Sequence, residues 1–107
     1  MKIINRIKRH EEFNKVIDEG KLLKSDSISL YYLKNDRGYT RIGISVPKKS
    51  GNAVVRNKIK RQIRAIIACS TDYKKSCDIV MVARKRFDID KFENSKSDIV
   101  NLLEKVG

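Results

Sequence analysis

The sequence predicts an α/β sandwich, an α+β arrangement in which helices pack on a small four-stranded sheet in the order α-β-β-β-α-β-α. Two observations predict this class. Apolar residues recur at helical spacing in three segments, and between them they alternate or form short runs typical of strands. The chain has 107 residues, of which 40% are hydrophobic. We therefore expect a single domain over residues 1–107 with one small core.

The first elements are a helix and two strands. Residues 10–19 place apolar side chains on one face of a predicted helix, and we expect this helix to end at Gly20. Residues 21–24 predict a short edge strand. Residues 28–33 are rich in aromatic and β-branched side chains, as strands are. Residues 35–38 (Asn-Asp-Arg-Gly) then favour a hairpin turn into the next strand.

The third strand is expected over residues 39–46. Its alternation would point Ile42, Ile44 and Val46 toward the core. The opposite face would carry Arg41, Gly43 and Ser45, and we expect that face to be accessible.

Pro47 ends this strand, and the longest helix follows from residue 53 to about residue 68, with Asn52 as its N-cap. Its apolar stripe comprises Val55, Ile59, Ile63, Ile66 and Ile67. Residues 78–84 form a nearly continuous apolar run, which predicts a strand buried on both faces. Asp90 and Glu93 resemble a capping box for the last helix. That helix is expected to bury Phe92, Ile99, Leu102, Leu103 and Val106.

The charge is distributed unevenly along the chain. There are 25 Lys and Arg against 13 Asp and Glu, a net charge of +12. Residues 37–71 contain nine Lys or Arg and no Asp or Glu. Concentrated positive charge attracts polyanions, so this segment predicts nucleic-acid binding. A merely soluble basic surface is the alternative, although solubility does not require the absence of every carboxylate from 35 consecutive residues.

The long helix carries the densest charge. Arg56, Lys60 and Arg64 stand at i, i+4 and i+8 and form one row, while Asn57 and Arg61 form the adjacent row. Like charges at this spacing destabilise an isolated helix, which favours a polyanionic partner. An ordinary amphipathic helix with a basic polar face is the alternative.

The loop before this helix adds two further cations. Lys48 and Lys49 precede the helix N-terminus, where free backbone N–H groups favour phosphate. The loop lacks the Gly-Lys-Ser/Thr ending of a P-loop, which argues against nucleotide hydrolysis. Residues 84–86 (Arg-Lys-Arg) form a second basic cluster, expected to contact nucleic-acid phosphates or to be a solvated end.

The sequence gives little support for a metal site or for catalysis by the protein's own side chains. His10 is the only histidine and has no ligand cluster at zinc spacing, so we expect no metal site in the protein. Cys69 and Cys77 are expected to be buried or half-buried free thiols. The paired carboxylates fall at predicted helix starts, where they favour the helix dipole. We therefore expect no catalytic residue in the chain itself.

The sequence also gives expectations about location. No apolar run approaches the ~20 residues that a membrane span needs, so we expect no membrane partner. The first residues lack the apolar stretch of a signal peptide, and a cytoplasmic protein is expected.

Residues 41–64 read Arg-Ile-Gly-Ile-Ser-Val-Pro-Lys-Lys-Ser-Gly-Asn-Ala-Val-Val-Arg-Asn-Lys-Ile-Lys-Arg-Gln-Ile-Arg. This segment closely resembles the signature of the bacterial ribonuclease P protein subunit, in which a strand ending in Ser-Val-x-Lys-Lys runs through Gly-Asn-Ala-Val to a basic "RNR" helix. Residues 11–16 look like the family's first helix and residues 78–85 like its fourth strand. The resemblance therefore covers essentially the whole chain.

The resemblance implies a function as well as a fold. It implies a left-handed β-α-β crossover through the basic helix, which is a rare handedness. It also implies that an RNA partner holds the catalytic Mg²⁺ ions and removes the 5′ leader of precursor tRNA. The protein would bind that RNA and hold the single-stranded leader in a cleft between the first helix, the sheet and the basic helix.

Site residues follow from the same resemblance. The residues expected to bind RNA are Lys48, Lys49, Arg56, Asn57, Lys58, Lys60, Arg61 and Arg64. Those expected to line the leader cleft are Phe13, Ile17, Tyr31 and Ser45. Two positions depart from the family pattern. Lys58 stands where the triplet has a second Arg and cannot form its bidentate contact. Ile17 stands where many relatives have Phe, and it can pack against a base but cannot stack on one.

Two other functions compete with this interpretation. A structural RNA-binding protein of the ribosomal type would share the basicity and fold, but it would not need an exposed Phe13 or Tyr31. A DNA-binding regulator would need a second helix a short turn from the basic helix, yet strands are expected on both sides of it. We therefore expect RNA partners and no DNA partner.

Overall fold

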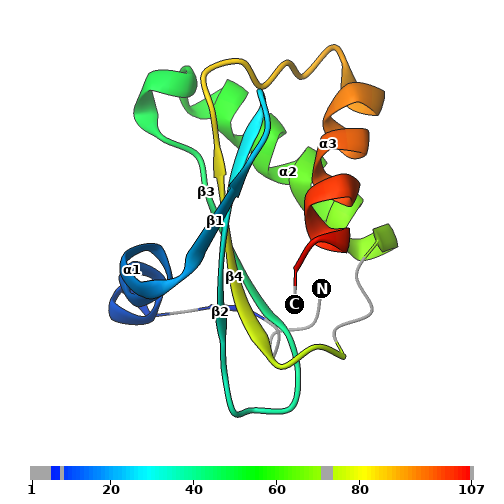
Figure 1. Ribbon diagram of the computed structural model, residues 1–107. Helices are drawn as coiled ribbons and strands as arrows, with labels where there is room; N and C mark the ends of the chain where they lie inside the picture. Colours follow the sequence, from blue (N-terminus) through cyan, green and yellow to red (C-terminus); the bar gives the residue numbers. More distant parts are fainter. Residues whose placement is uncertain (1–5, 8, 71–73, 107) are drawn as a thin grey trace.

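The computed structural model describes residues 6–7, 9–70 and 74–106 and has the expected order of elements. The elements are α1 (His10–Glu19), β1 (Lys21–Lys24), β2 (Ile28–Lys34), β3 (Arg41–Ser45), the short 3-10 turn η2 (Lys48–Ser50), α2 (Ala53–Ser70), β4 (Cys77–Ala83) and α3 (Phe92–Glu104). Figure 1 shows α1 on one face of the sheet and α2 with α3 on the other. This confirms the α-β-β-β-α-β-α sandwich.

The four strands lie in the order β1-β2-β4-β3. β4 pairs antiparallel with β2 and parallel with β3. The parallel pair is connected through α2, which forms the expected β-α-β crossover. β1 pairs only with β2 in this sheet and is the edge strand that its sequence predicts.

The predicted hairpin between β2 and β3 is wrong. The chain does bend at residues 36–39, and Gly38 has φ +83°, but the two strands on either side of the bend are separated by β4. The physical reason lies in β4 itself, which is buried along nearly its whole length. A strand buried in this way is typical of the middle of a sheet covered by helices on both faces, and β4 lies there, between β2 and β3.

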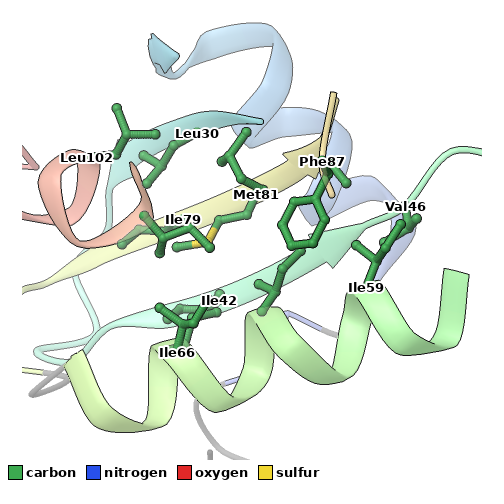
Figure 2. Close-up of a cluster of buried hydrophobic side chains, with 14 of the residues drawn as sticks. Leu30, Ile42, Val46, Ile59, Ile66, Ile79, Met81, Phe87 and Leu102 are labelled. Carbon is green, nitrogen blue, oxygen red and sulfur yellow. The ribbon is translucent and has the colours of Figure 1, made fainter. Parts of the chain in front are cut away.

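The main core fills the space between the sheet and the helices α2 and α3. Ile59, Ile63, Ile66 and Ile67 of α2 are at most 2% exposed, which confirms the predicted stripe. Figure 2 shows Ile59 and Ile66 of α2 pointing toward the sheet, with Ile66 beside Ile42 and Ile59 beside Val46. Phe87, from the connection after β4, joins the same cluster.

The last helix is correctly placed but not capped as predicted. It begins at Phe92 with Lys91 as its N-cap, and no side chain caps it. Asp90 is therefore not the first residue of a capping box. Instead, Asp88 Oδ1 accepts a hydrogen bond of 2.9 Å from the Asp90 N–H, which forms a turn before the helix.

One thiol differs from the expectation, and Gly20 ends α1 as predicted. Cys77 is buried as expected, whereas Cys69 is exposed. Gly20 ends α1 with an extended backbone at φ −77°. A side chain at Gly20 would meet the carbonyl oxygens of Val16 and Tyr32, so close approach explains this glycine.

Candidate nucleic-acid interface

The helix α2 presents a basic surface without internal neutralisation. Lys58, Arg61 and Arg64 are exposed, and Arg56 and Lys60 are partly buried. Within the described part of the chain, none of these five cations forms an ion pair. At 1.5 Å per residue the helix is about 27 Å long, which is enough to follow several phosphates.

The segment before α2 fixes where this basic surface begins. Asn52 Oδ1 accepts a hydrogen bond of 3.0 Å from the Val55 N–H, as the predicted N-cap should. Gly51 has φ +143°, and a Cβ there would stand 3.0 Å from Val55 Cβ. Only glycine suits both conditions. The exposed Lys48 and Lys49 therefore lie in the 3-10 turn just before the cap.

A groove of about 470 Å³, here called the α1 groove, lies between α1, the end of β3 and α2. Its lining consists of Arg9, His10, Phe13, Asn14, Ile17, Ile44, Ser45, Val46 and Lys60. The structure thus brings together three of the four predicted cleft residues, Phe13, Ile17 and Ser45. It also adds Lys60 from the basic helix to the same groove.

The position of the Phe13 ring in the α1 groove depends on a glycine in β3. A Cβ built on Gly43 would stand 2.5 Å from Phe13 Cε2, so the missing side chain makes room for the ring. Phe13 packs beside the small cluster of Ile7, Val16 and Val80 while remaining partly exposed. The ring is therefore both anchored in the core and accessible from the groove.

Tyr31 lies outside the α1 groove. It is on the α1 side of the sheet and packs with the same cluster as Phe13. However, Tyr31 pairs with Val80 on one side of β4, and Gly43 pairs with Val80 on the other. Strands are about 4.8 Å apart, so β4 separates Tyr31 from β3 by two strand spacings. The hairpin prediction had made these strands neighbours.

Arg41 departs most from its predicted role. It is 7% exposed rather than accessible. Its Nε and Nη2 donate to the two carboxylate oxygens of Asp78 at 2.9 and 2.7 Å, and Nη2 also donates to Glu12 at 2.6 Å. Arg37 reaches the same Glu12 oxygen at 3.4 Å. Arg41 is thus neutralised within the fold and offers no charge to a polyanion.

This buried cluster connects α1 to the sheet and shifts the pKa of its members. Hydrogen bonding from Arg41 lowers the pKa of the Glu12 carboxyl. Burial alone would raise the pKa of the Asp78 carboxyl, but hydrogen bonds from Arg41 and Asn35 outweigh burial and lower it. The hydrogen bonds that Arg41 donates to Asp78 and Glu12 in turn raise the pKa of Arg41. All three groups are therefore ionised at neutral pH.

Sequence reasoning missed part of this site. Arg9, His10 and Asn14 line the α1 groove, and His10 and Asn14 share a helical face with Phe13 and Ile17. The i, i+3, i+4 and i+7 spacing of these four residues could have placed His10 and Asn14 beside the predicted cleft residues. The partners of Arg41 had no local signal, because Glu12 and Asp78 are 29 and 37 residues away in sequence.

No group of three or more His, Cys, Asp or Glu side chains that could hold a metal ion occurs in residues 6–7, 9–70 and 74–106. His10 is exposed at the first position of α1. Over the same residues, no helix is both long and apolar enough to cross a membrane.

Known proteins resemble this chain along its whole length. The family model described as Ribonuclease P matches residues 1–107. A ribonuclease P protein component from Mesoplasma florum is 42% identical over 99 residues, covering 91% of this chain and 90% of that protein. One from Streptococcus agalactiae is 34% identical and covers 100% and 98%.

Solved structures agree with these sequence matches. The ribonuclease P protein from Thermotoga maritima superposes with a TM-score of 0.85 at 30% identity, covering 95% of this chain and 97% of that one. The protein from Staphylococcus aureus gives a TM-score of 0.80 at 32% identity, covering 95% and 96%.

Proposed function

Because the chain belongs to the ribonuclease P protein family, we propose that it binds the catalytic RNA through α2 and holds the 5′ leader of precursor tRNA in the α1 groove. The chain is the RNA-binding protein subunit of the enzyme that processes the 5′ end of tRNA. In this assignment the RNA performs the cleavage, and the protein contributes binding and orientation.

The observation that carries the proposal is the shared position of Lys60. This residue belongs to the basic helix and also lines the α1 groove that contains Phe13. A single strand lying in the groove would have a ring for its bases and a cation for its phosphate. Stacking of a base on an aromatic ring is sequence-tolerant, which suits leaders of varied sequence.

The remaining cations suit the RNA partner. Lys48, Lys49, Lys58, Arg61 and Arg64 are exposed at the start and along the outside of α2. Phosphate contacts from such side chains position a protein on RNA without reading its sequence. Asn57 is exposed among them and offers its amide to the same backbone or to a base edge.

We propose that the required Mg²⁺ ions are bound chiefly by the RNA. Mg²⁺ prefers oxygen ligands and keeps much of its hydration, and RNA phosphates supply such ligands. The described side chains do not form a ligand cluster of their own, so no step by this protein is assigned through the metal. The proposed compartment is the cytoplasm.

The structural RNA-binding alternative predicts a different use of the α1 groove. A protein that only scaffolds RNA has no need for an accessible ring beside a basic helix, yet Phe13 is partly exposed there. Membership of the ribonuclease P family also favours the processing role.

The test is cleavage of precursor tRNA by bacterial ribonuclease P RNA at low Mg²⁺, with and without the protein. We expect the protein to stimulate release of the 5′ leader and to cleave nothing alone. Tight, salt-sensitive RNA binding without any stimulation would support the structural alternative instead.

A further inference from the structure

A second groove lies along the opposite flank of α2. It measures about 450 Å³ and is here called the α3 groove; it is lined by Lys58, Arg61, Gln62, Ala65, Ile89, Asp90 and Phe92. Successive residues of a helix are 100° apart, so Lys58 in this groove and Lys60 in the α1 groove differ by about 200° around the axis. The basic helix therefore forms a ridge between two grooves.

We propose that the α3 groove binds one unpaired nucleotide of the catalytic RNA, an inference that rests on the proposed function. Its α2 wall is formed by residues at i, i+3, i+4 and i+7, which share one helical face. Lys58 and Arg61 are both exposed on this wall. They are one turn apart and can both approach a single phosphate.

The opposite wall offers a surface for a base. Phe92 and Ile89 pack against the main core on one side and remain partly exposed. A ring held in this way is a rigid platform that loses little freedom on stacking. Ala65 is exposed on the α2 wall, and its small side chain leaves space between that wall and Phe92.

Gln62 gives the groove a hydrogen-bonding position. Its Nε2 donates to the Ile89 carbonyl oxygen at 2.8 Å, which ties the two walls together. Its Oε1 is buried and has no hydrogen-bond partner. A buried acceptor without a donor is unfavourable. A small adjustment of the amide would let a base amino group or a ribose hydroxyl satisfy it.

Asp90 narrows the choice of ligand. This exposed carboxylate lines the groove and repels an extended run of phosphates. It can accept hydrogen bonds from a sugar hydroxyl or a base amino group. Two cations, a ring, a free amide oxygen and a carboxylate together fit a single nucleotide better than a bare anion.

The catalytic RNA is the occupant that the geometry favours. The leader is assigned to the α1 groove on the other flank, and the exposed cations of the ridge are assigned to the catalytic RNA. An RNA lying on that ridge reaches the α3 groove directly. The leader would have to cross α2 to reach it.

Ala65→Leu tests the proposal by filling the groove without removing a contact. Leucine is a good helix former, and position 65 is exposed, so the fold should be kept. Ala68→Leu is the matched control, because Ala68 is exposed on the same helix and does not line the α3 groove. We expect Ala65→Leu to weaken binding of ribonuclease P RNA about five- to tenfold and Ala68→Leu to stay within twofold. Equal affinities for the two variants would overturn the proposal.

A second pair of variants examines the ring itself. Phe92→Leu keeps an apolar side chain but removes stacking, whereas Phe92→Tyr keeps the ring. We expect a severalfold loss of affinity for the first variant and a loss of less than twofold for the second, with melting temperatures within a few degrees of wild type. Equal affinity of both variants with wild type would overturn the role of the ring.

Photocrosslinking identifies the bound RNA. Benzoylphenylalanine is placed at position 92 or at position 17 of the holoenzyme with precursor tRNA bound. We expect position 92 to crosslink to the catalytic RNA and position 17 to the leader. A crosslink from position 92 to the leader would contradict the assignment. Failure of the wild-type protein to bind or stimulate the RNA would instead refute the proposed function, so the two failures are distinguishable.

Discussion

The ring of Phe13 lies against the backbone of Gly43, so closely that a Cβ on Gly43 would stand 2.5 Å from Phe13 Cε2. Phe13 belongs to α1 and lines the α1 groove, whereas Gly43 belongs to β3 and is the buried backbone on which the ring rests. The groove therefore depends on a missing side chain in the sheet as much as on the aromatic residue above it.

Gly43→Ala should displace the Phe13 ring and weaken leader binding. The added methyl group must push the ring away, because the sheet backbone cannot move as easily. We expect the holoenzyme to lose about five- to tenfold in affinity for precursor tRNA with a leader, within the range that stacking can provide. Affinity for leaderless tRNA should be unchanged. Equal losses for both substrates would show that the variant damages the fold rather than the groove.

Glu12→Gln should lower stability only where Glu12 is ionised. The pKa of Glu12 is lowered in the folded protein, so its contribution is complete above the unfolded value of about 4.3 and is lost as pH falls through the folded value. We expect the variant to be about 1 kcal/mol less stable at pH 7. The difference should shrink below about pH 4, because wild-type Glu12 is then neutral too.

Glu11→Gln is the matched control for this measurement. Glu11 is adjacent in α1 and exposed. Urea unfolding of the three proteins at several pH values gives the comparison. A stability loss for Glu12→Gln that does not change with pH would contradict the role of the ion pair with Arg41.

Binding of the catalytic RNA should depend steeply on salt. Seven cations lie in or just before α2, while Arg37 and Arg41 are engaged by Glu12 and Asp78. At 0.7–0.9 released ions per phosphate contact, the log–log slope should be about −5 to −6. Arg61→Ala should reduce its magnitude by about 1, whereas Lys96→Ala, on the exposed surface of α3, should not. A slope near zero would refute the electrostatic account.

The two thiols should differ in reactivity. Cys69 is exposed, whereas Cys77 is buried and burial raises its pKa, which disfavours the reactive thiolate. With a disulfide reagent, we expect one thiol per folded molecule to react quickly and both to react in denaturant. Cys69→Ser should abolish the fast phase. Two fast thiols in the folded protein would contradict the position of β4.

Local patterns were sufficient for most of the fold. The apolar stripe of α2 and the apolar run of β4 each predict that these side chains are buried, and the structure confirms both predictions. The order of the strands could not be predicted from local patterns. The turn signal at residues 35–38 is the same whether β2 and β3 pair directly or β4 lies between them. The two buried faces of β4 were the available clue that it lies centrally in the sheet.

The site was predictable to the extent that its residues are close in sequence. The spacing along α2 predicts one basic surface, and the spacing along α1 places Phe13 and Ile17 together. The relationships across the sheet were not accessible in this way. Arg41 looked like another cation for RNA, and only the folded chain places Asp78 beside it. The fit of Phe13 on Gly43 likewise depends on tertiary packing.

The most direct test of the account is the affinity of the holoenzyme for precursor tRNA as the leader is lengthened from zero to about eight nucleotides. We predict that affinity with wild-type protein rises with leader length and then levels off. With Phe13→Leu, which keeps the apolar packing but removes the ring, the rise should be much smaller. A wild-type affinity that does not depend on leader length would contradict leader binding in the α1 groove.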